Sequence, residues 1–135
     1  MAGREALVCT QHLGINSFPP GVTFLILSSL LQAGCSKIFI TSRKADACDA
    51  AVAALNALPN KSPGAQAYSI PADSSKISEI DRLVKEVSKH TDHVDILFAN
   101  AGATWGSTFE ETDEKNGWDR VMDLNVKGVF FTIQK

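Results

Sequence analysis

The stretch VDILFANAG, residues 94–102, decides the fold class. Four consecutive apolar residues, 96–99, follow an acidic residue and precede a polar Asn-Ala-Gly segment, which predicts a strand buried on both faces that opens into a loop at its carboxyl end. Such strands belong to parallel sheets. Because ligands of open parallel sheets bind beyond the carboxyl ends of the strands, we expect Asn100, Ala101 and Gly102 beside a binding site.

The rest of the chain alternates between strand and helix patterns. Short apolar runs predict further strands at residues 6–9, 37–41 and 65–70. Helical spacing and stop signals predict helices at residues 22–33, which end at Gly34, and at 45–58, 75–91 and 113–135, the last interrupted around Asn125 and Gly128. The alternation predicts an α/β fold with a parallel sheet and right-handed crossovers.

Composition indicates one domain, residues 1–135, with enough apolar content, 44%, for a core. The net charge of −2 gives no reason to expect a nucleic-acid or membrane partner. The start of the chain does not resemble a signal peptide, and no apolar run is long enough to cross a bilayer. Cys9, Cys35 and Cys48 lack metal-site spacing, so we interpret them as reduced packing residues of a cytoplasmic protein. The alternative is one reactive thiol among them.

Basic residues follow the second predicted strand, where dinucleotide folds that grip a free ribose 2′-hydroxyl carry an acid. Arg43 and Lys44 stand there instead. A guanidinium pairs well with a 2′-phosphate, which favours NADP(H) over NAD(H) if a dinucleotide binds. The alternative is a solvated basic turn.

Three motifs together resemble the N-terminal half of the short-chain dehydrogenase/reductase family. They are ANAG at residues 99–102, Asp73 after the third strand, and LNVKGVFF at residues 124–131. The segments SRKADACDAA, NAGATWG and NGWDRVMDLNV most resemble the branch of rhamnolipid-type 3-oxoacyl reductases. The resemblance implies a three-layer Rossmann-like parallel sheet that is incomplete, with the strand order 3-2-1-4 and the later strands absent.

The family resemblance also implies roles for single residues. It implies that Asp73 accepts a hydrogen bond from the adenine amino group, and that Asn125 sits in a helix kink and holds a water of a proton relay. Without the family, Asp73 reads as an acid at a helix N-terminus, and Asn125 as a mid-helix amide. The remaining implied cofactor contacts are Gly14, Ile15, Arg43, Asn100, Ala101, Gly102 and Val126.

The implied reaction is hydride transfer from NADP(H) to a small-molecule carbonyl or acyl-thioester substrate. The implied homo-oligomer forms through the helix at residues 113–135. Trp105 lies in a loop that the family's substrate often passes, although packing on its own scaffold is the favoured interpretation. His90 and His93 end a predicted surface helix, and a solvated helix end is favoured there over a metal site.

The phosphate loop departs from the family pattern. TGxxxGxG aligns with CTQHLGIN, residues 9–16, and only Gly14 survives. Thr10 and Asn16 replace glycines needed for the tight turn and for close helix packing, so we expect impaired cofactor binding. Residues 10–30 are therefore atypical, either a real insertion or a gene-model fault.

The family's catalytic Ser and Tyr-x-x-x-Lys have no match in the chain. Tyr68, the one tyrosine, falls on the third predicted strand. The expected protein is thus a truncated NADP-dependent reductase, inactive alone, and the alternatives are a non-catalytic splice or gene-model fragment that binds nucleotide weakly or pairs with a protein, or an unrelated binding module on this fold. In a truncated sheet the strand within residues 94–102 becomes an edge, which predicts poor solubility.

Overall fold

The computed structural model describes residues 3–10 and 21–135. Four strands form one parallel sheet in the order β3-β2-β1-β4, so the predicted fold class and strand order are confirmed. The strands are β1 (Arg4–Thr10), β2 (Cys35–Thr41), β3 (Gln66–Ser69) and β4 (Ile96–Asn100). The predicted sites at Gly14 and Ile15 lie outside the described residues.

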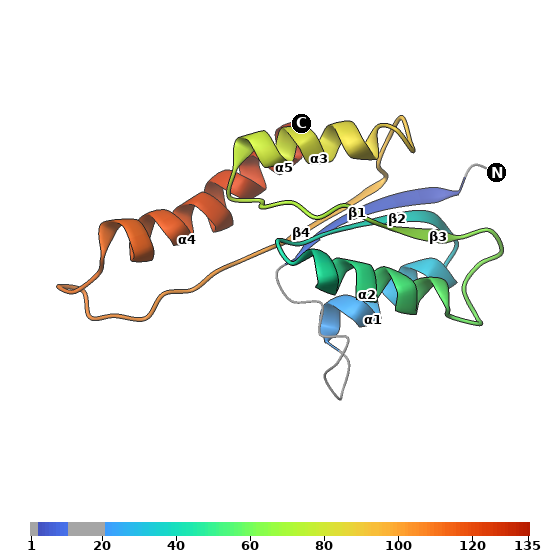
Figure 1. Cartoon of the computed structure of the whole chain (residues 1–135), viewed down its shortest axis with the longest axis horizontal. Coiled ribbons are helices and arrows are strands. Elements are labelled where there is room, and N and C mark those ends of the chain that lie inside the picture. The colour runs from blue at the N-terminus through green and yellow to red at the C-terminus, as the bar shows by residue number, and fades with distance from the viewer. Residues whose placement is uncertain (1–2, 11–20) are drawn as a thin grey trace.

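Helices cover both faces of the sheet, which gives three layers (Figure 1). On one face lie α1 (Val22–Gln32) and α2 (Ala45–Asn56), and on the other lie α3 (Ile77–Val87) and α5 (Val129–Gln134). Gly34 follows α1 with a φ of 101°, a left-handed conformation that suits glycine and ends the helix as predicted. None of the described helices has the length and apolarity needed to cross a membrane.

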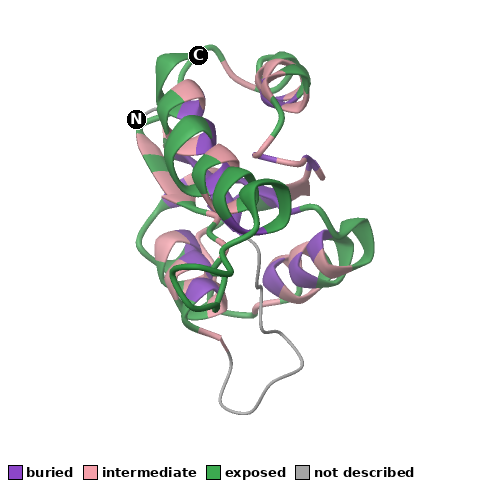
Figure 2. Cartoon of the chain, turned by 90° about the vertical axis from the view of Figure 1, so that its left-hand side faces the viewer, coloured by how far each residue is buried: buried purple, intermediate pink, exposed green. Residues whose placement is uncertain are grey.

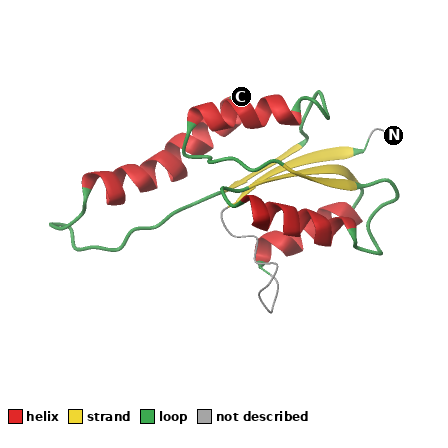
Figure 3. Cartoon of the chain, viewed as in Figure 1, coloured by secondary structure: helices red, strands yellow, loops and turns green. Residues whose placement is uncertain are grey.

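The long C-terminal helix predicted at residues 113–135 is present but irregular. Two π-helical stretches, Glu114–Asp119 and Asp123–Gly128, alternate with α4 (Arg120–Met122) and α5. The second stretch contains both Asn125 and Gly128, which explains the break in the apolar spacing there. After the long loop that follows β4, this helix returns so that α5 lies beside α3 (Figure 3).

The core has two halves, one on each side of the sheet. Alternate residues of β1 divide between them, with Ala6 and Val8 facing α1 and α2, and Leu7 and Cys9 facing α3. Figure 2 shows the buried residues of the helices turned toward the sheet.

The prediction that the strand within residues 94–102 is buried on both faces is wrong. β4 pairs with β1 on one side, and no strand among the described residues pairs with its other side. Leu97 is consequently 37% exposed. The apolar run is typical of a central strand, but β4 lies at the sheet edge, as expected for a sheet that contains only these four strands.

Candidate functional site

The carboxyl ends of the four parallel strands meet at one edge of the sheet. Thr10 ends β1 and lies opposite Asn100, the last residue of β4. The Asn100 Nδ2 lies 3.5 Å from the Oγ1 of Thr23, a buried residue in the first turn of α1. The structure therefore places the Asn-Ala-Gly segment beside the start of α1, at the edge where sheets of this kind bind ligands.

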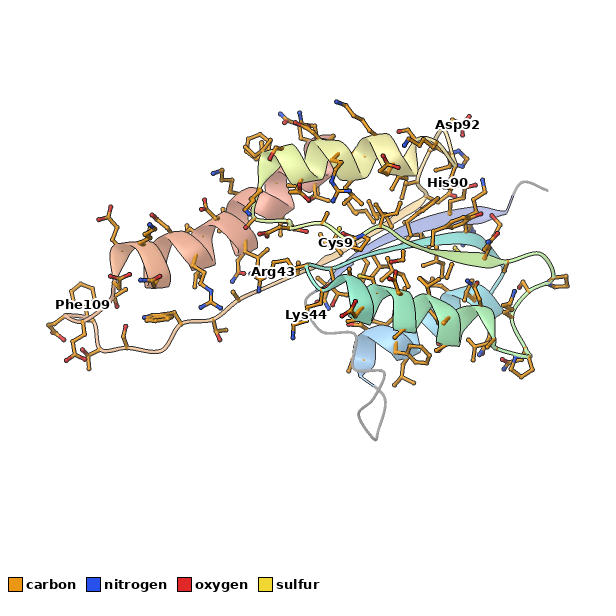
Figure 4. The ribbon with its side chains drawn as sticks, viewed as in Figure 1. Cys9, Arg43, Lys44, His90, Asp92 and Phe109 are labelled. Atoms are coloured by element: carbon orange, nitrogen blue, oxygen red, sulfur yellow. The ribbon has the colours of Figure 1, made fainter. Side chains whose placement is uncertain are left out.

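Arg43 and Asp73 come together at this edge from the ends of β2 and β3. Both line an open cavity of about 250 Å³, together with Pro71, Ala72 and Lys76. Figure 4 shows Arg43 and Lys44 at the carboxyl end of the sheet, next to the long loop. An exposed guanidinium and a carboxylate thus share one opening.

The Asp73 carboxylate is fixed by hydrogen bonds within its own turn, and its pKa is lowered. Its Oδ1 accepts from the backbone N–H of Ser75 at 3.1 Å and from the Ser75 hydroxyl at 2.7 Å. Oδ2 lies 3.6 Å from Lys76 Nζ. Burial alone would raise the pKa of Asp73, but the Ser75 hydrogen bonds and the charges of Arg43 and Lys76 outweigh it, so the pKa is lowered.

The structure also bears on the alternative interpretation of Asp73 as an acid at the N-terminus of a helix. The residue that precedes α3 is Lys76, not Asp73, and the Asp73 side chain bonds within its own turn. The carboxylate therefore shapes the loop after β3 and does not cap the helix, and it is ionised at neutral pH.

Asn125 binds the loop that follows β4. Its Oδ1 accepts from the Ala103 N–H at 2.8 Å, and its Nδ2 donates to the Ala103 carbonyl at 2.8 Å. A Cβ on Gly102 would lie 3.6 Å from the same Oδ1. Asn125 therefore joins the Asn-Ala-Gly loop to the π-helical stretch, whereas Val126, the next residue, is 54% exposed.

The sequence analysis did not identify three side chains that the structure places at the site. Arg120 and Asp123 line a small cavity of about 70 Å³ with Arg43 and Asp73. The third side chain is that of Thr23, whose Oγ1 lies 3.5 Å from Asn100 Nδ2. A charged pair at i, i+3 on the last helix was the available signal, but the sequence does not show that this face turns toward the ends of β2 and β3.

Several residues considered in the sequence lie away from this edge. The Tyr68 ring stacks on Phe39, with 5.3 Å between ring centroids, and makes a tilted contact with His90, with 4.6 Å between centroids. His93 pairs with Asp92 at 2.6 Å. His90 and Asp92 lie at the opposite end of the sheet from Arg43 (Figure 4), and the part of the chain that is described holds no cluster of metal-binding side chains.

The loop tryptophan packs on its own scaffold. The ring of Trp105 lies so close to Gly117 that a Cβ on this glycine would come within 2.9 Å of Cδ1. Because Gly117 has no side chain, the indole packs directly against the C-terminal helix. This agrees with the interpretation of Trp105 as a residue that packs on its own scaffold.

The three cysteines are free and buried. Burial raises the pKa of Cys9 to about 12 and that of Cys48 to about 11, and it also raises the pKa of Cys35. A thiol with a raised pKa carries little thiolate, so these are packing residues and not nucleophiles.

A parallel sheet in the order 3-2-1-4, helices on both faces, and loops that converge at the carboxyl ends define the Rossmann-like class of fold. The match with known sequences is more specific. Residues 20–135 match the family described as short chain dehydrogenase, and the chain belongs to that family.

The chain is similar to oxoacyl reductases of bacteria. It is 36% identical over 135 residues to the rhamnolipids biosynthesis 3-oxoacyl-[acyl-carrier-protein] reductase of Pseudomonas aeruginosa, with 100% of this chain and 47% of the relative covered. It is 39% identical over 75 residues to the 3-oxoacyl-[acyl-carrier-protein] reductase FabG of Staphylococcus epidermidis, with 56% of this chain and 30% of the relative covered.

Solved structures give the same result. The chain superposes on the Pseudomonas aeruginosa RhlG/NADP active-site complex with a TM-score of 0.78 at 35% sequence identity. The match covers 99% of this chain and 46% of the RhlG chain. The chain also superposes on a mutant of a Serratia marcescens short-chain dehydrogenase/reductase with a TM-score of 0.79 at 26% sequence identity. This match covers 98% of this chain and 49% of the Serratia chain. The chain thus spans about half the length of the relatives it matches.

Proposed function

We propose that residues 1–135 form the nucleotide-binding part of an NADP(H)-dependent carbonyl reductase of the 3-oxoacyl type. The observation that carries this proposal is the meeting of Arg43 and Asp73 at one cavity beyond the ends of β2 and β3. Membership of the short-chain dehydrogenase family supports the reaction class, and the RhlG/NADP complex supports the choice of cofactor.

The residues at the sheet edge fit the adenosine half of NADP(H). The Asp73 carboxylate is ionised and lies in a cavity of about 250 Å³, so it can accept a hydrogen bond from an exocyclic amine. The exposed Arg43 guanidinium at the same cavity suits a 2′-phosphate. Asn100, Ala101 and Gly102 would line the ribose from the end of β4, and Val126, Gly14 and Ile15 complete the proposed contacts.

Bound NADP(H) would supply the hydride for reduction of a carbonyl or acyl-thioester substrate. In this proposal, Asn125 positions the loop after β4 through Ala103 and contributes to a proton relay. Tyr68, the one tyrosine of the sequence, contacts the rings of Phe39 and His90 away from this edge and cannot serve as the acid of that relay. We therefore expect the 135-residue chain to be inactive by itself.

The rest of the proposal concerns the setting of the chain. A cytoplasmic protein agrees with the three free thiols. A homo-oligomer through the 113–135 helix is supported by apolar side chains that are exposed along it, among them Trp118, Phe130 and Ile133.

Binding of adenosine fragments tests the proposal without involving the phosphate loop. We expect 2′,5′-ADP to bind more tightly than 5′-AMP by isothermal titration calorimetry. Arg43→Ala should weaken 2′,5′-ADP by about ten- to a hundredfold and leave 5′-AMP unchanged, since a charge-assisted hydrogen bond contributes about 1.5–3 kcal/mol. Arg4→Ala is the matched control, because it removes an exposed guanidinium at the opposite end of β1.

The loss of preference for the 2′-phosphate should be specific to Arg43. Equal binding of the two fragments by the wild-type chain would reject the NADP assignment, and no binding of either at millimolar concentration would reject a nucleotide role. Reduction of a ketone by the purified 135-residue chain with NADPH would reject the expected inactivity.

A second candidate is a non-catalytic splice or gene-model fragment that pairs with another protein. Within residues 3–10 and 21–135, no strand pairs with the outer side of β4, and this favours the second candidate. Binding of a polypeptide without any nucleotide affinity would support this candidate over the first.

A further inference from the structure

Arg120 brings the C-terminal helix into contact with the candidate site. It is the exposed first residue of α4, and it lines the cavity of about 70 Å³ together with Arg43 and Asp73. Because Arg43 and Asp73 follow β2 and β3, this cavity lies where the sheet edge meets the helix. The contacts proposed above for NADP(H) do not use Arg120.

The guanidinium of Arg120 is available to a ligand. Asp123, three residues further along the helix, pairs with Lys127 at 3.2 Å and not with Arg120. Within residues 3–10 and 21–135, the Arg120 side chain forms no ion pair and no hydrogen bond. An arginine side chain has five N–H donors, and in Arg120 all of them remain for a group that enters the cavity.

The Asp73 carboxylate is the hydrogen-bond acceptor in the wall of the same cavity. Its Oδ1 already accepts two hydrogen bonds from Ser75, whereas Oδ2 makes a longer contact of 3.6 Å with Lys76 Nζ. An ionised carboxylate can therefore accept a further hydrogen bond at this oxygen. The volume of about 70 Å³ is far below that of a pocket that encloses a whole ligand, so the cavity admits only the edge of a ring.

One edge of adenine carries the matching pattern of donors and acceptors. The exocyclic amine donates, and the ring nitrogens on either side of it, N1 and N7, accept. A carboxylate can accept from the amine while a guanidinium beside it donates to a neighbouring ring nitrogen. A phosphate would suit Arg120 but would be repelled by the ionised Asp73, so the pair of side chains favours the base over the phosphate.

We propose that Arg120 binds the adenine base, with its guanidinium donating to a ring nitrogen of the base whose amine binds Asp73. Arg43 remains the residue that binds the 2′-phosphate. The inference rests on the proposed function, because Asp73 meets adenine only if the site binds NADP(H). It adds a contact from the C-terminal helix to those from the strand ends.

The same contact links the base to the loop that follows β4. Arg120 lies on the helix that carries Asn125, and Asn125 holds Ala103 by two hydrogen bonds of 2.8 Å. Ala103 also lines the small cavity. A base bound to Arg120 would therefore restrain the helix and, with it, the pairing of Asn125 and Ala103. Nucleotide binding should then stabilise this loop.

Two nucleotides separate the role of Arg120 from that of Arg43. Arg120→Ala should weaken 5′-AMP and 2′,5′-ADP by the same factor, about tenfold or more by isothermal titration calorimetry, because both lose one charge-assisted hydrogen bond to the base. Arg120→Lys keeps a charged donor and should recover part of this loss. Arg43→Ala should weaken 2′,5′-ADP alone. Lys115→Ala is the matched control, because it removes an exposed cation from the same helix outside the cavity.

The outcomes distinguish failure of the inference from failure of the proposed function. If the wild-type chain and Arg120→Ala bind 5′-AMP equally well, Arg120 does not bind the base, although the proposed function stands. A loss confined to 2′,5′-ADP would also overturn the inference, since Arg120 would then bind the 2′-phosphate. If the wild-type chain binds neither nucleotide at millimolar concentration, the proposed function fails and the inference fails with it.

Hydrogen exchange on the unmodified chain tests the link to the loop. Saturating 5′-AMP should slow exchange of the Ala103 amide several-fold, while the Ala33 amide, which bonds to Ser29 at the end of α1, should not change. In Arg120→Ala, saturating 5′-AMP should leave the Ala103 amide unprotected beyond its level in the free chain. Equal protection of Ala103 in the two proteins would overturn the role of Arg120 in this link.

Discussion

The side-chain amide of Asn125 forms two hydrogen bonds with the backbone of Ala103, 22 residues earlier in the chain, each 2.8 Å long. One amide thus satisfies both the N–H and the C=O of a single loop residue. The pairing joins the loop that follows the edge strand to the π-helical stretch Asp123–Gly128. Loop and helix therefore form one structural unit at the carboxyl end of β4.

Asn125→Asp should weaken this unit without removing volume. The carboxylate still accepts from the Ala103 N–H but can no longer donate to the Ala103 carbonyl, which it instead repels. We expect a loss of about 1–2 kcal/mol in the free energy of unfolding, measured by urea denaturation. Hydrogen exchange of the Ala103 amide should also accelerate.

Asn116→Asp is the control for the change of an amide to a carboxylate in the same helix, where the exposed Asn116 is bonded through its backbone N–H. The two variants should differ in stability. If they are equally stable, the pairing of Asn125 with Ala103 contributes nothing measurable.

Gly128 is required by close packing. A Cβ at this position would come within 2.2 Å of the Ser74 carbonyl oxygen and 3.1 Å of that of Asp123. Both neighbours are backbone atoms, which cannot swing aside. Gly128→Ala should therefore destabilise the fold by about 1–3 kcal/mol or more, measured as a shift of the urea midpoint.

Gly106→Ala serves as the comparison, because a Cβ there meets no atom within 4 Å. It should leave the midpoint nearly unchanged. A Gly128→Ala variant as stable as wild type would mean that the C-terminal helix does not pack against the Ser74 loop as the structure shows.

The sequence was sufficient for the order of elements because the periodicities are local. The amphipathic spacing of α3 lies within one helix, and the breaker residues that follow α1 and α2 lie directly beside the helices that they end. The exposure of β4, in contrast, could not be predicted from a local pattern. Its run of apolar residues is the same for a central and an edge strand, so burial of Leu97 depended on a neighbour that the local pattern cannot reveal.

At the candidate site, too, the positions of some residues could be predicted from the sequence and those of others could not. Arg43 and Asp73 follow two strands, and parallel strands bring such residues to one edge, so their proximity could be predicted. Arg120 and Thr23 reach that edge from helices. Which side of a helix faces the strand ends depends on packing, and π-helical turns shift that side further, so neither residue was found in advance.

The buried thiols should resist modification in the folded chain. Burial raises the pKa of Cys9 to about 12 and of Cys48 to about 11, so thiolate is scarce at pH 8. We expect negligible reaction with iodoacetamide in buffer and alkylation of all three cysteines in urea, followed by mass spectrometry. Rapid labelling of Cys9 in the native chain would show that β1 is open to solvent at its carboxyl end.

His93 belongs to a polar network at the amino end of the sheet, opposite the candidate site. The network joins Glu5 of β1, Lys37 of β2, and Asp92 and Asp95 of the connection to β4. The Glu5 carboxylate is 6% exposed and accepts from Lys37 Nζ at 2.8 Å. Burial would raise the pKa of Glu5, but the hydrogen bonds from Lys37 and Thr91 and the charges of Lys37 and His93 together outweigh it, so the pKa is lowered.

The pH dependence of this network follows from the direction of each pKa shift. The hydrogen bond that the His93 ring donates to Asp92, together with the charges of Asp95, Asp92 and Glu5, raises the pKa of His93 above its ordinary value of 6.5. The stabilisation from His93 is therefore complete below about pH 6.5 and is lost as the pH rises through the raised pKa. The stabilisation from Glu5 and Asp92 has the opposite dependence, because their pKa values are lowered and it disappears only in acid.

Titration of the His93 ring protons by NMR should thus give a pKa above 6.5, and Asp92→Asn should bring it down toward that value. Since the ring bonds directly to Asp92 at 2.6 Å, the change should exceed the one caused by Asp46→Asn, a substitution on α2. A His93 pKa at or below 6.5, or one that Asp92→Asn leaves unmoved, would show that the pair of His93 and Asp92 is open in solution.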